Sequence, residues 1–211
     1  MQVKPISKQL ATEYVVRHHY MHRRPPISYA FGLFPSEGIC LGVVTFGTPA
    51  SRHMLVGSCP DEPASVIELN RLWVSDECPR NTESWFLARA LKQLPPRIVL
   101  SYADTLAGHV GHVYRAANFR YAGWTDMERK TARFDYVTPG MHTRDAFRKG
   151  EVRFTERVRR KPKVRYWTIT GTRRDKKRLL ELCRWPDMCW TAQPPPMEHR
   201  QLMEAPAIAD E

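Results

Sequence analysis

The sequence lacks the features of a membrane protein and of a disulfide-rich protein. Its 211 residues contain no apolar run near the roughly 18 residues that a membrane helix needs, and the first residues, MQVKPISKQ, contain no apolar signal region. The cysteines are odd in number and never stand in a C-x-x-C spacing, which excludes a disulfide framework and a zinc ribbon. We therefore expect a soluble, intracellular protein with reduced thiols at Cys40, Cys59, Cys78, Cys183 and Cys189.

One segment of the chain has few acidic residues. Between residues 144 and 178 there are 15 Lys and Arg against 4 Asp and Glu, a difference equal to the whole net charge of +11. Aromatic residues interleave with these bases, at Phe147, Phe154, Tyr166 and Trp167. A charge run is often only a solvated face, but bases mixed with aromatics favour a nucleic-acid surface, because bases neutralise phosphates and aromatic rings stack on nucleobases. We assign DNA contacts to Arg23, Arg24, Arg159, Arg160, Lys161, Lys163 and Arg165.

The stretch Ile98–Trp124 combines a strand, a helix and a second strand. Its apolar, β-branched beginning indicates a strand, and Ser101 and Asp104 stand at the carboxyl end of that strand, the edge at which open α/β sheets bind ligands. The helical spacing of apolar residues from 110 to 117 turns Tyr114 inward. A strand-end carboxylate and an inward phenol can therefore converge on one pocket.

The whole pattern predicts an α/β fold with a mixed central sheet flanked by helices and a basic C-terminal extension. Before the central stretch we expect a strand at 2–6, a helix at 7–22, a hairpin of strands at 27–34 and 39–47, a loop at 48–63, a strand at 66–74 and a helix at 84–94. After it we expect a strand at 131–137 that closes the sheet, a strand at 164–169 and a helix at 175–185. The corresponding domains are a catalytic core at 1–140, a nucleic-acid-binding extension packed on the core at 141–190 and a flexible tail at 191–211.

Three histidines cluster at the end of the first predicted helix. His18 and His22 are one helical turn apart and could ligate a metal, although no acidic or cysteine partner stands nearby in the sequence. The alternative, which we favour, is a polar helix end that faces a substrate or a phosphate.

The predicted strand at 66–74 carries polar residues, which are costly to bury without partners. Alternation along the strand puts Glu68 and Asn70 on one face and Arg71 on the other. A structural ion pair between Glu68 and Arg71 is one explanation, and a functional site is the other.

The loop after this strand leads into a helix with Thr82 or Ser84 as its N-cap. Arg80 and Asn81 would bring a cation and free backbone amides together at the helix N-terminus, an arrangement that suits an anion. A plain capped helix explains the same residues.

Two resemblances connect these observations. The tyrosine-bearing helix and the Asn118-Phe119 turn resemble the C-terminal half of the GNAT acyltransferase core, with Asn118 in the place of the usual glycine. A wider set of motifs, from about residue 4 to residue 184, resembles the Mom family of bacteriophage DNA-modification proteins. These motifs are His18-His19-Tyr20, Arg23-Arg24-Pro25-Pro26-Ile27-Ser28, Glu68-Leu69-Asn70-Arg71-Leu72-Trp73, Ser101-Tyr102-Ala103-Asp104 and Gly111-His112-Val113-Tyr114.

The family resemblance implies a phage-encoded enzyme in the host cytoplasm that converts adenine in double-stranded DNA to N6-carbamoylmethyladenine and so protects the DNA from restriction. The N6 amine lies inside the base stack, so the base must be flipped out and the amine must lose a proton. We expect Asp104 to be the general base, with Glu68 as the alternative, and Tyr114 to be the general acid. His19 and Tyr20 are expected to contact the flipped adenine. The residues expected around the donor and the oxyanion are Asn70, Arg71 and Ser101, and those expected to bind the donor are Arg80, Asn81 and Ser84.

The donor stays open. The loop at 79–84 lacks both glycines of the R/Q-x-x-G-x-G/A pattern of GNAT enzymes, which favours a donor other than acetyl-CoA. A glycyl group on N6 is an isomer of the product, so a glycyl donor such as glycyl-tRNA followed by a rearrangement balances the atoms, whereas an acetyl donor needs added nitrogen. An iron requirement, with the histidines as candidate ligands, and a homodimer are also left open.

Two rival functions remain at this stage. One is an ordinary GNAT acetyltransferase that acts on an amine of a protein or tRNA and binds acetyl-CoA tightly. The other is a non-catalytic DNA-binding protein that blocks restriction by occupancy, for which Asp104 and Tyr114 are dispensable.

Overall fold

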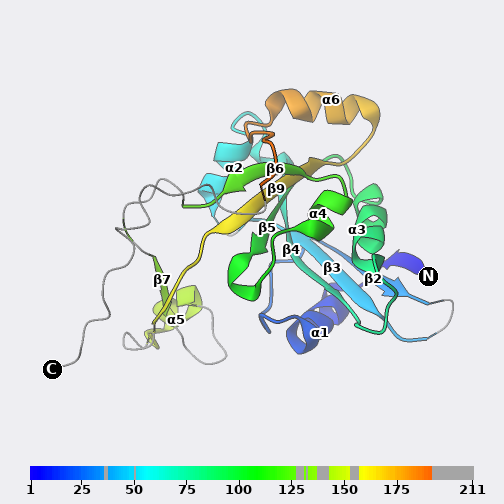
Figure 1. Cartoon of the computed structure of the whole chain (residues 1–211), viewed down its shortest axis with the longest axis horizontal. Coiled ribbons are helices and arrows are strands. Elements are labelled where there is room, and N and C mark those ends of the chain that lie inside the picture. The colour runs from blue at the N-terminus through cyan, green and yellow to red at the C-terminus, as the bar shows by residue number, and fades with distance from the viewer. Residues whose placement is uncertain are drawn as a thin grey trace.

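A seven-stranded mixed sheet forms the centre of the molecule (Figure 1). The computed structural model describes residues 1–35, 38–49, 51–126, 131, 133–136, 143–152 and 157–191. In spatial order the strands are β1 (Gln2–Pro5), β2 (Tyr29–Phe34), β3 (Gly42–Gly47), β4 (Val66–Val74), β5 (Ile98–Asp104), β9 (Lys163–Ile169) and β6 (Arg120–Trp124). All neighbours are antiparallel except β4 and β5, which run parallel.

The parallel pair opens after three residue pairs. Val66, Ile67 and Glu68 pair with Ile98, Val99 and Leu100, and beyond them the two strands continue without pairing to Val74 and Asp104. A register shift between Thr45 and Phe46 of β3 displaces β4 at the same level. The two strands are therefore splayed beyond Glu68 and Leu100, and the splay leaves a wedge between β4 and β5.

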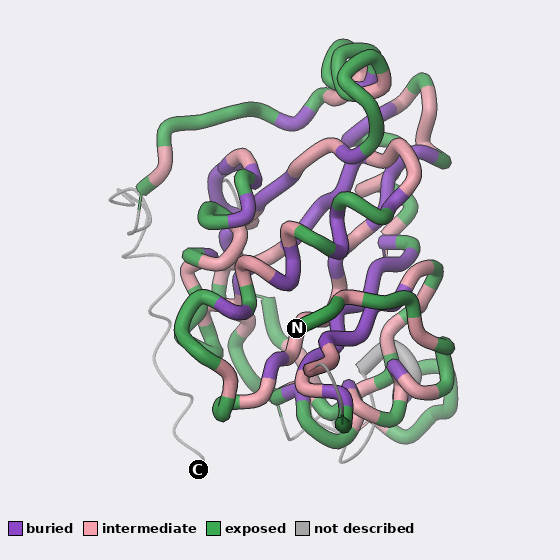
Figure 2. The backbone as a smooth tube through the Cα atoms, turned by 90° about the vertical axis from the view of Figure 1, so that its right-hand side faces the viewer, coloured by how far each residue is buried: buried purple, intermediate pink, exposed green. Residues whose placement is uncertain are grey.

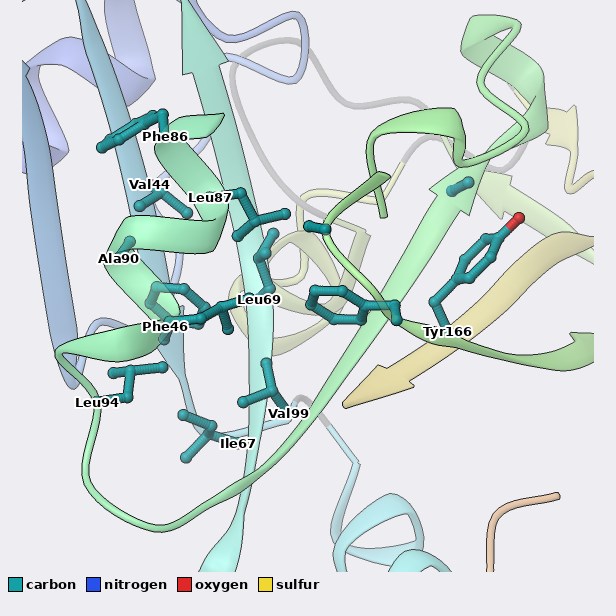
Figure 3. Packing of buried hydrophobic residues seen from close by; sticks show 14 of the residues in the cluster. Val44, Phe46, Ile67, Leu69, Phe86, Leu87, Ala90, Leu94, Val99 and Tyr166 are labelled. Carbon is teal, nitrogen blue, oxygen red and sulfur yellow. The ribbon is translucent and has the colours of Figure 1, made fainter. Parts of the chain in front are cut away.

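Helices cover both faces of the sheet. On one face, α3 (Thr82–Lys92) and α4 (His112–Ala116) pack against the strands, and Figure 3 shows the contacts of Phe86, Leu87 and Ala90 with Val44, Phe46 and Leu69. The other face carries α1 (Lys8–His18), α2 (Arg52–Ser58) and α6 (Arg173–Leu182). Buried residues follow the strands and exposed residues follow the outer turns (Figure 2), so the fold prediction of a mixed sheet flanked by helices is confirmed.

Local sequence explains where several elements begin. The Ser7 side chain accepts a hydrogen bond from the Leu10 amide at the start of α1. Thr172 and Asp175 form a capping box at the start of α6. Strand β5 begins with three buried apolar residues, as expected for a strand that is covered on both faces.

Two expectations about secondary structure differ from the structure. The predicted loop at 48–63 contains α2 and the 3-10 turn η1 (Pro63–Ser65). The predicted strand at 131–137 does not close the central sheet: its described part, β7 (Phe134–Tyr136), pairs with β8 (Arg157–Arg159) in a separate two-stranded ribbon beside α5 (Thr143–Lys149). The edge beyond β5 is instead formed by β9 and β6: β9 lies inside the sheet, where its apolar residues are buried on both faces, and β6 is the edge strand.

The expected boundary at residue 140 does not follow the sheet either. Strand β9, which was expected in an appended extension, lies between β5 and β6. Tyr166 and Trp167, expected among the aromatic residues of a DNA surface, are fully buried in the core. Phe154 and the tail from residue 192 onward lie outside the described residues.

Candidate active site

Ser101 and Tyr114 meet where β4 and β5 separate. Ser101 is fully buried, and its hydroxyl lies 3.5 Å from the carbonyl oxygen of Leu69 on the opposite side of the wedge. The Tyr114 side chain comes from α4 and forms a hydrogen bond with the Ser101 side chain. The wedge therefore contains a serine hydroxyl and a phenol in contact.

The Tyr114 phenol is strongly held in its protonated form. Burial raises the pKa of Tyr114 to about 12, because a phenolate would be poorly solvated, and the hydrogen bond from Ser101 offsets part of this rise. The negative charges of Glu68 and Glu83 raise it further, as does Tyr20 where its own phenol is ionised. At neutral pH Tyr114 can donate a proton.

His19 and Tyr20 form a stacked pair at the mouth of the wedge. Their ring centroids are 4.3 Å apart, and the Tyr20 ring lies 5.6 Å from the ring of His109. His19 is 7% exposed, whereas Tyr20 is 49% exposed. Burial and the charge of Asp104 raise the pKa of Tyr20. The pair presents a half-exposed aromatic surface beside a carboxylate.

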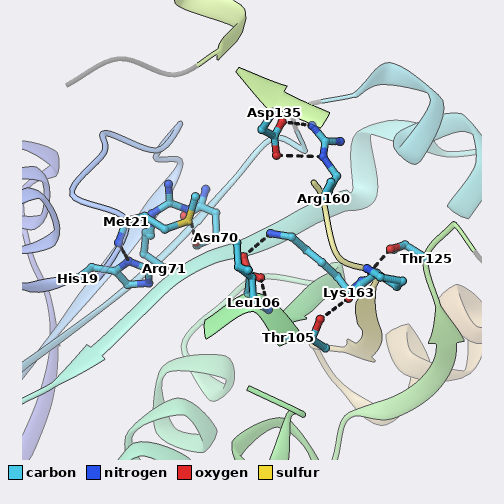
Figure 4. Close-up of polar contacts among 12 residues, drawn as sticks. His19, Met21, Asn70, Arg71, Thr105, Leu106, Thr125, Asp135, Arg160 and Lys163 are labelled. Atoms are coloured by element: carbon cyan, nitrogen blue, oxygen red, sulfur yellow. Dashed lines mark hydrogen bonds and ion pairs between the residues drawn. The ribbon is translucent and has the colours of Figure 1, made fainter. Parts of the chain in front are cut away.

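His19 is neutral at physiological pH. Burial, followed by the charges of Arg71, His109 and His22, lowers its pKa to about 4. Its Nδ1 accepts a hydrogen bond from the Met21 amide at 3.2 Å (Figure 4), so the ring proton is on Nε2. His19 can therefore act as a hydrogen-bond donor to a neutral partner.

Asp104 ends β5 and is held on both of its oxygens. Lys163 Nζ donates to Oδ2 at 2.7 Å (Figure 4), and the Leu106 amide donates to Oδ1 at 3.1 Å. The Asp104 side chain is 14% exposed. A carboxylate has about four acceptor positions, so two remain for a further donor.

The polar residues of β4 have different roles. Asn70 accepts a hydrogen bond from Thr45 at 2.6 Å and donates to the Pro26 carbonyl oxygen at 2.7 Å, so its amide joins the 23–28 segment to the sheet. Arg71 donates to the Asn70 carbonyl, and its buried Nε has no partner among the described residues. Burial lowers the pKa of Arg71, while Tyr20 and Glu68 raise it. Glu68, at the last parallel pair, also acts electrostatically on Tyr102 and Tyr114.

The start of α3 does not form a glycine-rich phosphate cradle. Asn81 is the N-cap in a left-handed conformation with φ of 67° and makes no side-chain cap. Arg80 and Asn81 are exposed, and the Ser84 hydroxyl donates to the Asn81 carbonyl. Arg80 favours an anion here, but Glu83 in the first turn opposes one. These residues do not fit a CoA pyrophosphate well, and the acyl transfer proposed for this site does not depend on CoA.

The histidines expected as metal ligands have other contacts. His18 stacks on Trp73 with a centroid distance of 4.4 Å, and His22 Nδ1 lies 2.9 Å from the Val16 carbonyl oxygen. Among the described residues no three His, Cys, Asp or Glu side chains are grouped as metal ligands. The described residues therefore do not fit an iron site.

The predicted DNA-contacting cations divide into two groups. Arg24, Arg159 and Lys161 are exposed, and Arg23 is half-buried. The others are engaged within the protein: Arg160 pairs with Asp135, Lys163 pairs with Asp104, and Arg165 is half-buried over Trp185. Sequence reasoning could not separate these groups, because the acidic partners lie 25 and 59 positions away.

Sequence reasoning missed three residues of the site. His109 lies beside Tyr20, and Tyr166 and Trp190 lie behind α4. His109 follows the Asp104 strand end by five residues, which was a usable signal. The positions of Tyr166 and Trp190 depend on β9 and on the chain after α6, so no local pattern indicated them.

The sheet order, the parallel pair that opens, and the tyrosine-bearing helix beside the wedge define a GNAT-type fold with a polar site between β4 and β5. Solved structures of acetyltransferases are similar to this chain. One from Bacillus subtilis, in complex with CoA, is 10% identical, covers 81% of this chain and 99% of its own, and has a TM-score of 0.41. A putative acetyltransferase from Salmonella typhimurium, with acetyl-CoA, is 9% identical over 82% and 95%, with a TM-score of 0.45. Scores at this level carry no argument about activity.

The sequence model of the Mom protein family matches residues 1–179, and the chain belongs to that family. The methylcarbamoylase Mom of Escherichia phage Mu is 35% identical over 132 residues, which are 58% of this chain and 54% of the relative. The chain thus spans about half the length of this curated relative. No helix in the described part of the chain is long and apolar enough to cross a membrane.

Proposed function

We propose that the protein modifies the N6 amine of adenine in phage DNA by an acyltransferase-like reaction that ends in N6-carbamoylmethyladenine. The observation that carries the proposal is the pair formed by buried Ser101 and half-buried Tyr114 in the wedge, next to the His19 and Tyr20 stack and Asp104. Family membership and the name of the phage Mu relative support the substrate class. DNA as substrate implies action in the host cytoplasm, and modified adenine would protect the DNA from restriction.

The proposed adenine site is the mouth of the wedge. A flipped base needs an aromatic surface to stack on and hydrogen-bonding groups at its edge. The half-exposed Tyr20 ring supplies the surface, and neutral His19 supplies a ring N–H. His109, whose ring centroid lies 5.6 Å from that of Tyr20, is a further neighbour of this site.

The proposed proton transfers use Asp104 and Tyr114. Adenine N6 attacks the carbonyl carbon of the donor, a bond from N6 to that carbon forms, and the N6 proton passes to a free acceptor position of Asp104. The bond between the carbonyl carbon and the leaving oxygen or sulfur breaks, and Tyr114 gives its proton to the leaving atom. Ser101 keeps the Tyr114 hydroxyl in place. Glu68 is the alternative proton acceptor, because its charge acts on Tyr114.

The donor that balances this chemistry is a glycyl ester, such as glycyl-tRNA. Acyl transfer from it gives N6-glycyladenine, an isomer of the carbamoylmethyl product, so the rearrangement adds and removes no atoms. The first turn of α3, with Glu83 and without glycine, agrees with a donor other than acetyl-CoA. Arg71, half-buried with a free Nε, is the proposed contact for the donor's carbonyl oxygen.

The proposed duplex contacts are the exposed cations next to the wedge. The β7 and β8 ribbon carries Arg157 and Arg159, and Lys161 follows them on the way to Lys163. The Thr105 hydroxyl donates to the Pro162 carbonyl oxygen at 2.6 Å (Figure 4), so this basic segment is fixed to the turn after Asp104. Phosphates bound by Arg157, Arg159 and Lys161 would therefore lie close to the adenine site.

Mass spectrometry of nucleosides tests the proposal. DNA from cells that express the protein should contain carbamoylmethyladenine, and DNA from cells that express Ser101→Ala should contain much less at an equal protein level. Acetylation of a protein or tRNA amine without modified adenine would favour the acetyltransferase alternative. Duplex binding without any modified nucleoside would favour a protein that acts by occupancy.

A further inference from the structure

Helix α4 carries Tyr114 but cannot stabilise itself. It has five residues, and its N-cap, Gly111, makes no side-chain cap. Helices this short are unstable alone, so contacts with the rest of the protein must fix α4. Those contacts determine where the Tyr114 hydroxyl lies.

Tyr166 of β9 fixes the beginning of α4. Its buried hydroxyl donates to the Val110 carbonyl oxygen at 2.6 Å, and its ring lies 5.3 Å from the Tyr114 ring. Gly111 has φ of 89°, and a Cβ added there would lie 2.2 Å from the Tyr166 ring. In the sheet Tyr166 is directly opposite Ser101, the partner of Tyr114. Tyr166 therefore connects the helix start to the strand that carries Ser101.

Trp190 fixes both Tyr166 and the last turn of α4. Its Nε1 donates to the Tyr166 hydroxyl at 2.8 Å. The Arg115 guanidinium lies 3.7 Å from the centre of the Trp190 ring, within the range of a cation–π contact. One tryptophan from the C-terminal region therefore contacts the helix and its anchor.

Trp190 belongs to a segment that crosses the edge of the sheet, residues 183–191, which we name the strap. The strap begins on the α2 face, where the Arg184 amide donates to the Ser58 carbonyl oxygen. It passes the edge strand β6, where the Met188 amide donates to the Tyr121 carbonyl oxygen, and it reaches the α4 face at Trp190. The family match ends at residue 179, so the strap lies beyond it.

We propose that Tyr166 and Trp190 are positioning residues for Tyr114, and that the strap completes the active site from outside the family match. This proposal rests on the proposed role of Tyr114 as proton donor. Trp190 orients the Tyr166 hydroxyl, Tyr166 holds the 110–111 backbone, and α4 then presents Tyr114 to Ser101. Loss of either contact lets α4 shift while the sheet and the DNA-contacting ribbon stay in place.

The test compares single-group deletions. Tyr166→Phe removes the hydroxyl that bonds Val110, and Trp190→Phe removes only the Nε1 donor and keeps a ring under Arg115. Trp190→Leu removes both contacts. Tyr29→Phe is the matched control, because it deletes a hydroxyl that accepts a hydrogen bond from Arg97, away from the strap and from α4.

Three quantities are measured: the rate of adenine modification, the affinity for duplex DNA, and the hydrogen exchange of the Tyr114 and Arg115 amides, which donate to Gly111. Tyr166→Phe should lower modification about 10- to 100-fold, the scale of a misplaced catalytic group. Trp190→Phe should lower it less than Trp190→Leu does. Duplex affinity should stay unchanged, and exchange of the two amides should become faster in all three variants and not in Tyr29→Phe.

The outcomes separate the two proposals. Parental modification rates or parental exchange rates in Tyr166→Phe and Trp190→Leu, with melting temperatures retained, refute the positioning role. A parallel loss of duplex affinity and modification also refutes it. If the parental protein itself modifies no DNA, the proposed function fails, and the exchange rates still decide whether Tyr166 and Trp190 hold α4.

Discussion

At the scale of single residues, the wedge combines groups with opposite proton preferences. Burial keeps Tyr114 protonated, with a pKa of about 12, and keeps His19 unprotonated, with a pKa of about 4. Asp104 offers acceptor positions at the mouth, although Lys163 occupies part of its capacity. At one and the same pH, Asp104 can therefore accept a proton from an incoming amine and Tyr114 can supply one to a leaving group.

Tyr114→Phe and Asp104→Asn each keep the shape of the side chain and remove its acid or base function. Each should lower adenine modification about 10²- to 10⁴-fold, the usual contribution of a general acid or base, with little change in duplex affinity. The matched control is Tyr29→Phe, which deletes a hydroxyl that bonds Arg97 outside the wedge. Nucleoside mass spectrometry and DNA titration measure both effects. If Asp104→Asn modifies adenine at the rate of the parental protein, the general base must be assigned to Glu68 instead.

His19 should make the stability of the protein depend on pH. The pKa of His19 is about 4 in the folded protein and 6.5 in an unfolded chain. Between pH 4 and pH 6.5 the unfolded chain therefore binds more protons than the folded protein does. The stabilisation is complete above pH 6.5 and is lost as the pH falls toward 4, up to about 3 kcal/mol for a shift of this size.

Urea denaturation at several pH values measures this loss. His19→Asn should flatten the dependence between pH 6.5 and 4, whereas the exposed-histidine control His53→Gln should keep it. An unchanged slope in His19→Asn means that His19 is not the group responsible.

At the scale of elements, the basic residues that the structure describes between 144 and 178 do not form one continuous surface but lie on separate elements. The β7 and β8 ribbon and α6 carry much of its exposed charge, and Figure 1 places them at different ends of the molecule. Arg160 and Lys163 fasten the ribbon and its connection through ion pairs with Asp135 and Asp104. The connection that follows the ribbon is fixed to the turn after Asp104, because the Thr105 hydroxyl donates to the Pro162 carbonyl oxygen.

Replacement of Arg157, Arg159 and Lys161 by Ala should weaken duplex binding and lower the slope of log affinity against log salt by about 2 to 3, since each phosphate contact releases about 0.9 counterion. The matched control replaces the exposed α6 residues Arg173, Lys176 and Lys177, with the same loss of charge. Binding titrations at several salt concentrations measure both. Equal effects of the two triple variants would show that net charge, and not the ribbon, determines affinity.

At the scale of the whole molecule, the core depends on a late part of the chain. Strand β9 pairs with β5 across seven residue pairs, and β6 pairs with β9 rather than with β5. Val164, Tyr166 and Trp167 are buried there, and each contributes about 1.5–3 kcal/mol to stability. Their sum is comparable with the whole stability of a domain, about 5–15 kcal/mol.

A fragment of residues 1–140 should therefore fail to fold, although the sequence suggested a core with that boundary. The control fragment, residues 1–191, keeps every described element and should unfold cooperatively. Circular dichroism during heating distinguishes them. Cooperative unfolding of the 1–140 fragment would restore the boundary at residue 140.

The sequence by itself determined the features that depend on neighbouring residues. Strand and helix periodicity located β4, β5 and α4, and the motifs identified the family and indicated Ser101, Asp104 and Tyr114 as candidate site residues. The tertiary structure decided what depends on distant partners: β9 inside the sheet, Asp104 beside Lys163, and Trp190 behind α4. Periodicity shows which residues will be buried, but it does not show against what they will be buried. Tyr166 and Trp167 lie in the core, and not on a DNA surface, because β9 pairs with β5. That pairing joins residues about 60 or more positions apart in the sequence.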